Sequence, residues 1–296
     1  MKKKLLLIVN PYAGKMRAKN ELLGICKIFC EADFTVTVHV TRCQSDATRA
    51  VVYSGREYDV IVACGGDGTL NEVVTGALRI GFTGAIGFLP CGTTNDFAGS
   101  LGIPKNLSAA ARLVAEGKAG FLDFGSFNGD RTFTYVATFG AFTDVAYATD
   151  QKLKNVLGHA AYVTEAIARL KDLRPYRVRV VCDGKEYEDD FLFGAALNSL
   201  SIGGVLKLKR ELVDLSDGMH EVLLVRNVKN AADLANLSVE ILSGNYENKS
   251  VLFFRGKEIE FSCREPIPWC VDGEFAGNHE TARVRNVHKR LKMIHS

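Results

Sequence analysis

The sequence predicts an N-terminal, mostly parallel α/β domain followed by a β-rich, sandwich-like domain. In the first 120 or so residues, short apolar runs alternate with helical apolar stripes, which is typical of a sheet covered by helices on both faces. From about residue 123 onward most segments are strand-like. The 296 residues suit two ordinary domains or one large one. We therefore expect one domain over 1–123 and a second over 124–283, and the segment 284–296 either pairs within the second domain or returns to the first.

The elements of the first domain follow from hydrophobic periodicity. Continuous or alternating apolar runs predict strands, and apolar residues at i, i+3, i+4 and i+7 predict helices. The expected strands are Leu5 to Val9, Thr35 to Val40, Val60 to Cys64 and Ala85 to Leu89. Four helices are expected: one with an apolar face from Leu22 to Cys30, one from Ser45-Asp46 through Val52, one with an apolar stripe from Leu70 to Leu78, and one from Ser108 to Ala115.

The second domain is predicted to be built mainly from strands. Asp183-Gly184 is a type I′ hairpin signal between two of them. One longer helix, from about Ala160 to Leu170, interrupts the series. The expected strands are Phe133 to Thr138, Arg177 to Cys182, Lys185 to Glu188, Phe191 to Asn198, His220 to Val225, Val251 to Arg255 and Glu258 to Ser262.

Composition argues for a cytoplasmic protein. A net charge of +3 is too small to indicate a nucleic-acid partner. Cys26 and Cys30 lie one helical turn apart without a second pair for zinc, so the eight cysteines are expected to be free thiols in a reducing cytosol. The apolar stretch near the N-terminus is too short for a signal peptide, and the longest uncharged runs, 80–95 and 191–206, are too short to span a bilayer. Contact with a membrane from outside stays possible.

The stretch CGGDGTLNE, residues 64–72, places three glycines between a predicted strand and a predicted helix. Gly65, Gly66 and Gly68 allow close backbone approach, and the first N–H groups of a helix lack partners and attract anions. These features predict a phosphate site, although a tight turn alone would also use glycine. Because neither the P-loop motif nor G-x-G-x-x-G occurs, backbone amides are expected to hold the phosphates.

Two of the remaining residues of this stretch, Glu72 and Asp67, have two interpretations each. Thr69 is expected to cap the helix, with Glu72 completing a capping box, and we favour this structural role for Glu72 over a catalytic one. Asp67 either binds a metal or orients water, or only caps the turn.

Two other loops follow strands of the same predicted sheet. The carboxyl ends of parallel strands meet at one edge, where ligands bind, so the loops should converge there together with Thr41. Asparagine, threonine and glycine amides suit the ribose and phosphates of a nucleotide. The candidate nucleotide-binding residues are Asn10, Pro11, Gly14, Thr41, Gly65, Gly66, Asp67, Gly68, Thr69, Asn71, Gly92, Thr93, Thr94, Asn95 and Asp96.

The order of motifs resembles the diacylglycerol kinase catalytic-domain family, which includes bacterial soluble lipid kinases and the sphingosine and ceramide kinases. The motifs are NPYAG, GGDGTLNEVV, PCGTTNDFA, LVDLSDGM and VDGE, and they cover about residues 4 to 275. GGDGT alone is also similar to phosphofructokinases and NAD kinases. The resemblance implies an ATP-binding α/β domain of phosphofructokinase or NAD kinase type, a β-sandwich lipid-binding domain and a lipid-binding cleft between them.

The resemblance also implies roles for particular residues. It implies ATP contacts at Asn10 to Gly14, Thr41, Gly66 to Asn71 and Thr94. It implies a magnesium site at Asp217, with the backbone oxygens of Asp214 and Met219, and Glu274 as the general base. Two alternatives for the last role stay open: Asp272 is the base, or both carboxylates only shape a hairpin.

The expected function is an ATP- and Mg²⁺-dependent lipid kinase, with diacylglycerol as the favoured acceptor and phosphatidic acid as its product. The alternatives are an NAD kinase and a non-catalytic nucleotide-binding sensor. Three basic segments, Lys2-Lys3-Lys4, 207–210 and 283–292, are either ordinary solvated surface or contacts to an anionic membrane. The oligomeric state is left open, a homodimer included.

Overall fold

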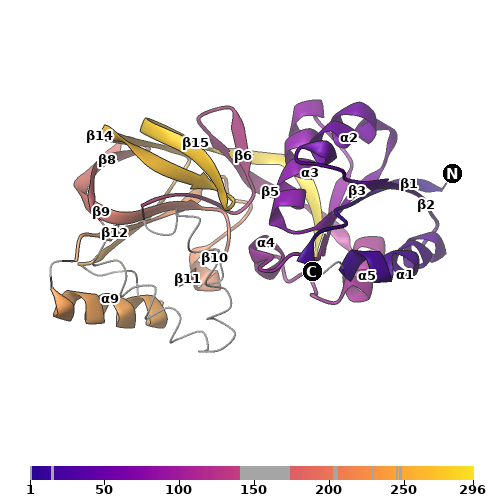
Figure 1. Cartoon of the computed structure of the whole chain (residues 1–296), viewed down its shortest axis with the longest axis horizontal. Helices are drawn as coiled ribbons and strands as arrows, with labels where there is room; N and C mark the ends of the chain where they lie inside the picture. The colour runs from indigo at the N-terminus through magenta and orange to yellow at the C-terminus, as the bar shows by residue number, and fades with distance from the viewer. Residues whose placement is uncertain are drawn as a thin grey trace. The chain divides into compact units, whose positions relative to one another are not determined.

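The computed structural model describes residues 2–14, 17–140, 174–202, 206–228, 230–244, 246 and 249–296. The chain forms two compact units (Figure 1). The first unit contains Met1–Phe124 and Val287–Ser296, and the second contains Gly125–Asn286. The predicted helix from Ala160 to Leu170 lies outside the described residues.

The first unit contains a parallel sheet with the strand order β15-β4-β3-β1-β2. Its strands are β1 (Lys3–Val9), β2 (Phe34–Val40), β3 (Val60–Gly65), β4 (Ala85–Pro90) and the end of β15 (Glu274–His295). Val9 is paired with both Val40 and Cys64, and Cys64 is paired with Leu89, so the four strands end nearly in line. This alignment brings the loops that follow them to one edge of the sheet.

Helices cover both faces of this sheet, which explains why β3 is buried along its whole length. Figure 1 shows α2 and α3 on one side of the strands and α1 and α5 on the other. The helices are α1 (Arg17–Glu31), α2 (Asp46–Ser54), α3 (Asp67–Ile80), α4 (Asp96–Ser100) and α5 (Leu107–Glu116), with a 3₁₀ turn at Gly55–Glu57.

The second unit is β-rich, as the sequence predicts, and its strands pair antiparallel. The path of paired strands is β13-β12-β9-β7-β14-β15. The elements are β5 (Lys118–Phe127), β6 (Arg131–Phe133), β7 (Val136–Gly140), β8 (Tyr176–Cys182), β9 (Lys185–Leu197), β10 (Ser201–Ile202), β11 (Leu206–Lys207), a 3₁₀ turn (Arg210–Leu212), β12 (His220–Arg226), α9 (Ala231–Ser243), β13 (Val251–Gly256) and β14 (Glu258–Val271).

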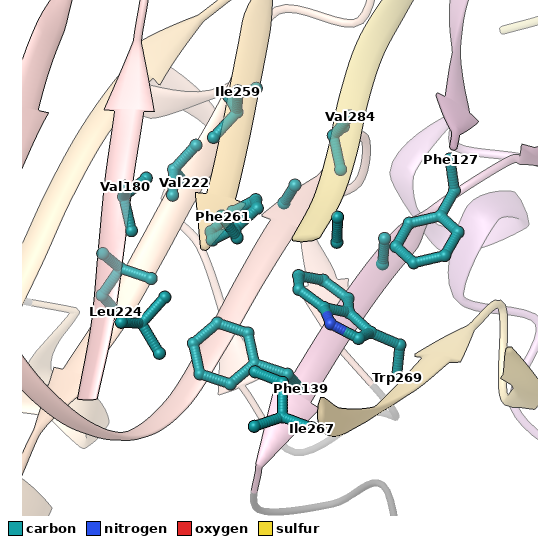
Figure 2. Packing of buried hydrophobic residues seen from close by; sticks show 14 of the residues in the cluster. Phe127, Phe139, Val180, Val222, Leu224, Ile259, Phe261, Ile267, Trp269 and Val284 are labelled. Atoms are coloured by element: carbon teal, nitrogen blue, oxygen red, sulfur yellow. The ribbon is translucent and has the colours of Figure 1, made fainter. Parts of the chain in front are cut away.

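Aromatic side chains fill the core of the second unit (Figure 2). The ring of Trp269 lies 5.1 Å from those of Phe139 and Phe261 and 5.2 Å from that of Phe127, centroid to centroid. These separations are typical of tilted and edge-to-face aromatic contacts. Strand β14 carries Trp269 and Phe261 into this cluster, so the core holds β14 firmly just before the turn at Asp272.

Three strand predictions in the second unit are wrong in detail. The segment from Phe133 to Thr138 is not one strand, because β6 ends at Phe133 and β7 begins at Val136. The predicted strands Lys185 to Glu188 and Phe191 to Asn198 form the single strand β9. The hairpin at Asp183-Gly184 is confirmed, with φ angles of 48° and 83°.

The end of the chain does both things that the sequence left open. Strand β15 pairs with β14 from Glu274 to Arg285 and then, at Lys292 and Met293, with β4 of the first unit's sheet. Among the described residues, no helix has the length and apolar character that crossing a bilayer requires.

Candidate active site

The loops that follow β1, β3 and β4 converge, as predicted. The side-chain amide of Asn10 donates a hydrogen bond to the hydroxyl of Thr69 at 3.2 Å, which joins the first loop to the glycine loop. The amides of Cys91 and Gly92 donate to the carbonyl of Gly65 at 2.7 and 3.3 Å. Thr41 joins the same edge, because its amide donates to the carbonyl of Val9 at 2.9 Å.

Glycine is required here because two backbones nearly touch. A Cβ atom on Gly66 would lie 3.3 Å from the Cα of Gly92, and one on Gly92 would lie 2.6 Å from the Cα of Gly66. A Cβ on Gly14, which has φ of 43°, would lie 1.7 Å from the carbonyl oxygen of Cys91. The φ of Gly66 is −92°, so close approach explains this glycine.

The capping box predicted at Thr69 and Glu72 is wrong. Helix α3 begins at Asp67 with Gly66 as its N-cap, so Thr69 lies inside the first turn. The carboxylate of Glu72 instead accepts the amides of Ser45 at 2.7 Å and Ala47 at 3.1 Å, at the start of α2. Glu72 therefore has a structural role, but it caps the neighbouring helix. Sequence spacing does not reveal this contact, because the partners lie 25 and 27 residues apart.

Asp67 also reaches across loops. Its carboxylate accepts the amides of Asp96 at 3.2 Å and Phe97 at 3.4 Å, at the start of the short helix α4. This contact favours the structural interpretation of Asp67, since it fixes the glycine loop to the loop after β4. The sulfur atoms of Cys64 and Cys91 lie 3.4 Å apart beneath these loops, and this contact together with burial raises the pKa of Cys64. All eight cysteines are free thiols.

Asn95 presents a buried acceptor at this edge of the sheet. It has φ of 53°, and its side-chain amide donates to the carbonyl of Gly92 at 2.7 Å. Its buried Oδ1 atom has no hydrogen-bond donor within the part of the chain that the structure describes. A ribose hydroxyl or a water molecule would satisfy it. Pro11, Gly68, Asn71, Thr93 and Thr94 lie on the same loops and on the first turns of α3.

A second cluster of candidate residues lies in the other unit, at the turn between β14 and β15. Asp272 and Gly273 have φ angles of 48° and 83°, the values of a two-residue I′ turn. The Asp272 carboxylate accepts the amides of Thr134, Tyr135 and Val136 at 2.6–3.0 Å and the Thr134 hydroxyl at 2.8 Å. The backbone amides between β6 and β7 therefore donate to Asp272, which explains the break in the predicted strand.

The two carboxylates of this turn differ in availability. Burial raises the pKa of Asp272, while its hydrogen bonds with Thr134, Tyr135 and Val136 act in the opposite direction. Both oxygens of Asp272 are already engaged, whereas Glu274 is exposed to solvent at the start of β15. Of the two, Glu274 is the carboxylate that a substrate can approach.

The predicted magnesium ligands occupy the segment before β12. Asp217 accepts the amide of Met219 at 2.9 Å and forms an ion pair with Arg255. The Met219 carbonyl accepts the side-chain amide of Asn286 at 3.2 Å, and the Asp214 carboxylate accepts the amide and hydroxyl of Ser216. Among the described residues, no three His, Cys, Asp or Glu side chains gather into a metal-binding group.

The sequence does not indicate the side chains that contact Asp217 and Met219. Arg255 also pairs with Glu221, whose Oε1 lies 3.1 Å from the arginine Nε. Glu221 is buried, which raises its pKa to about 7. Arg255 and Asp217 lie 38 residues apart, and Asn286 and Met219 lie 67 apart, so no local motif signals either contact.

Family models match nearly the whole chain. Residues 4–127 match the diacylglycerol kinase catalytic domain, and residues 136–295 match the YegS C-terminal NAD kinase beta sandwich-like domain. The chain belongs to the diacylglycerol kinase family. It is therefore a lipid kinase, and the predicted resemblance is confirmed.

Curated relatives agree with this assignment. The diacylglycerol kinase of Bacillus subtilis strain 168 is 33% identical over 92% of this chain and 89% of its own. The diacylglycerol kinase of Staphylococcus carnosus strain TM300 is 31% identical over 94% of this chain and 90% of its own.

Solved structures show the same fold. One from Bacillus anthracis strain Sterne has a TM-score of 0.84 and 26% identity, and covers 100% of this chain and 98% of that one. A diacylglycerol kinase of the same organism has a TM-score of 0.79 at 22% identity, with 100% and 97% covered.

Proposed function

We propose that this lipid kinase transfers the γ-phosphoryl group of ATP to the hydroxyl of diacylglycerol, giving phosphatidic acid. The observation that carries the proposal is the convergence of three loops at one sheet edge, with Gly66 against Gly92 and Asn10 bonded to Thr69. The names of the curated relatives support the choice of diacylglycerol. The first unit, on this proposal, is an ATP-binding domain of phosphofructokinase or NAD kinase type.

In this proposal, the glycine loop and the start of α3 hold the phosphates. The first amides of α3 have no partner inside the helix and lie at the positive end of its dipole. Gly66 and Gly68 leave these amides uncovered, because neither has a side chain. The hydrogen bond from Asn10 to Thr69 joins the glycine loop to the loop after β1, and the Asp67 carboxylate joins it to the loop after β4. Asn95 offers its Oδ1 to the ribose.

The Asp217 segment offers oxygen ligands of the kind that magnesium prefers. A carboxylate and two backbone carbonyls suit an ion that keeps several waters. The Met219 carbonyl has a second lone pair beside its bond to Asn286, and the Asp217 carboxylate has acceptor sites beyond Arg255 and Met219. The residues therefore fit the ion, with Asp217 and the carbonyls of Asp214 and Met219 as its ligands. Magnesium would neutralise phosphate charge during transfer.

Glu274 is the proposed general base. It would take the proton from the lipid hydroxyl as the oxygen attacks the γ-phosphorus, which requires an approach of about 2.6–3.2 Å. Its exposure and the full set of hydrogen bonds on Asp272 support this choice. Asp272 would position Glu274 by holding the turn.

Membrane contact is proposed to be peripheral and cytoplasmic. The basic residues near the C-terminus give it only partial support, because Arg283 pairs with Glu260 at 2.8 Å and Arg285 with Glu258 at 3.5 Å. Exposed pairs of this kind are typical of an ordinary solvated surface.

A substrate panel tests the function. Purified protein is incubated with labelled ATP, Mg²⁺ and mixed micelles that contain diacylglycerol, sphingosine or ceramide, with NAD in a separate reaction. Phosphatidic acid is expected as the main product. Phosphorylation of NAD without any lipid product would contradict the proposal, and ATP binding without turnover would favour a sensor.

A further inference from the structure

Asn286, on β15, is held against the segment that carries the proposed magnesium ligands. Its side-chain amide nitrogen, Nδ2, donates a hydrogen bond to the Met219 carbonyl at 3.2 Å, across 67 residues of sequence. Its backbone amide donates to the carbonyl of Lys257, the residue between β13 and β14, at 3.0 Å. His220, the residue after Met219, is paired with Gly256 at the end of β13. Backbone contacts of the two sheet strands therefore fix both ends of the Asn286–Met219 bond.

The other polar atom of this side chain, Oδ1, is buried and has no hydrogen-bond donor among the residues that the structure describes. The orientation of the amide group follows from its contact, because exchanging Oδ1 with Nδ2 would set two acceptors against each other at the Met219 carbonyl. A buried acceptor without a donor is costly to a folded protein. The Oδ1 atom therefore marks a position where a donor from outside the chain is expected.

A water molecule held by a divalent cation is the donor that fits this position. The Met219 carbonyl is one of the proposed magnesium ligands, and Oδ1 belongs to the same planar amide group as the nitrogen that contacts it. Mg²⁺ usually keeps several of its water molecules when it binds a protein. Groups that hydrogen-bond to metal ligands fix the position of those ligands and contribute to the affinity for the metal.

We propose that Asn286 is a positioning residue of the magnesium site, with Nδ2 holding the Met219 carbonyl in place and Oδ1 accepting a hydrogen bond from a water molecule that the ion retains. This role rests on the proposed magnesium site at Asp217. Bound magnesium then connects β15 to the segment before β12 through one side chain. The metal-free protein keeps the bond to Met219 but leaves Oδ1 without its donor.

Titration calorimetry of the nucleotide-free protein with Mg²⁺ alone tests this role in Asn286→Leu, a substitution that keeps the approximate size of the side chain and removes both polar atoms. The Kd for Mg²⁺ is expected to rise roughly 10- to 100-fold, the usual effect of removing a group behind a metal ligand. The increase in melting temperature that Mg²⁺ gives the wild type should shrink accordingly. Asn286→Asp keeps an acceptor and adds negative charge near the dication, so its Kd should rise less.

Asn230→Leu is the matched control in the same unit. It removes the N-cap of α9, where the Asn230 side chain accepts the amide of Asp233 at 2.9 Å. The melting temperature of this variant should fall, but its Kd for Mg²⁺ should equal that of the wild type. Asn286→Ala replaces Asn286→Leu in the comparison if leucine prevents folding.

The outcomes separate this role from the proposed metal site. An unchanged Kd in Asn286→Leu, with binding lost in Asp217→Ala, would overturn the role of Asn286 and leave the site standing. Equal rises of Kd in Asn286→Leu and Asn286→Asp would also overturn it, because the acceptor would then contribute nothing. Binding of Mg²⁺ that Asp217→Ala does not weaken would contradict the metal site and with it the role of Asn286.

Discussion

Asp272 accepts hydrogen bonds from both the backbone amide and the hydroxyl of Thr134, at 2.6 and 2.8 Å, across 138 residues of sequence. Its second oxygen accepts the amides of Tyr135 and Val136. One carboxylate thus fixes the chain between β6 and β7 to the turn that carries Glu274. In the motif Asp272-Gly273-Glu274, the carboxylate of Asp272 is thus engaged in holding the turn, whereas that of Glu274 is exposed.

Replacing Asp272 with Asn is expected to destabilise the protein more than it slows the chemistry. The amide nitrogen of asparagine is itself a donor, and it would face N–H groups whose hydrogen bonds the carboxylate now accepts. The free energy of unfolding should therefore fall by about 1–3 kcal/mol. Urea denaturation measures this change, and kcat per folded molecule should fall less than in Glu274→Gln. Thr134→Val, which removes one hydroxyl, should cost about 1 kcal/mol. An Asp272→Asn protein of wild-type stability without turnover would give Asp272 a chemical role.

Gly66→Val is expected to abolish ATP binding without unfolding the second unit. The added side chain would meet the backbone of Gly92, where even a Cβ would lie 3.3 Å from its Cα, and would cover the phosphate site. Calorimetric titration with ATP and Mg²⁺ measures the affinity. Gly24→Ala is the control, because a Cβ there meets nothing within 4 Å on α1. Unchanged nucleotide affinity in Gly66→Val would mean that the loop is only a turn.

Glu72→Ala is expected to weaken ATP use through the loop before α2. The amides of Ser45 and Ala47 lose their acceptor, which should cost roughly 0.5–2 kcal/mol of stability, the usual value of a lost N-cap. The KM for ATP should rise more than kcat falls, since Thr41 precedes this loop. Glu57→Ala, which removes an exposed carboxylate from the 3₁₀ turn, is the control and should change neither the stability nor the KM for ATP. A selective loss of kcat would instead support a catalytic role for Glu72.

Asp217→Ala is expected to shift the magnesium dependence of turnover to higher concentration and to lower the maximal rate. The substitution removes the only side-chain ligand of the proposed site and one of the two ion pairs of Arg255, leaving the pair with Glu221. Activity is titrated with Mg²⁺ at fixed ATP, with Asp130→Ala on an exposed turn as the control. ATP affinity of the first unit's loops should be retained. A titration curve identical to the wild type would remove Asp217 from the site.

The sequence predicts the sheet of the first unit well because its signals are local. The strand from Leu5 to Val9 and the helix from Leu70 to Leu78 are predicted from the pattern of apolar residues alone, and the structure has both, with small differences at the ends. The convergence of the loops at Asn10, Gly66 and Gly92 also follows, since parallel strands place their carboxyl ends at one edge.

Long-range side-chain contacts account for what the sequence does not predict. The local sequence predicts that Glu72 completes a capping box. In the structure, α3 begins two residues before Thr69, and the Glu72 carboxylate instead accepts a hydrogen bond from the start of α2. The strand from Phe133 to Thr138 is interrupted by a carboxylate more than 130 residues away. The register of β15 shifts by one residue at Ala276, where Arg131 donates to the carbonyl of Phe275 from 144 residues away, and no pattern within β15 reveals that contact.

In the proposed mechanism, Glu274 takes the proton from the lipid hydroxyl. The most direct test is kcat of Glu274→Gln with diacylglycerol and saturating ATP, because the substitution keeps the size of the side chain and removes the base. We expect kcat to fall by about 10²–10⁴-fold, the usual contribution of general-base catalysis, with the KM for ATP nearly unchanged. If Glu274→Gln keeps most of its turnover while Asp272→Asn is folded and inactive, the assignment of the base must be reversed.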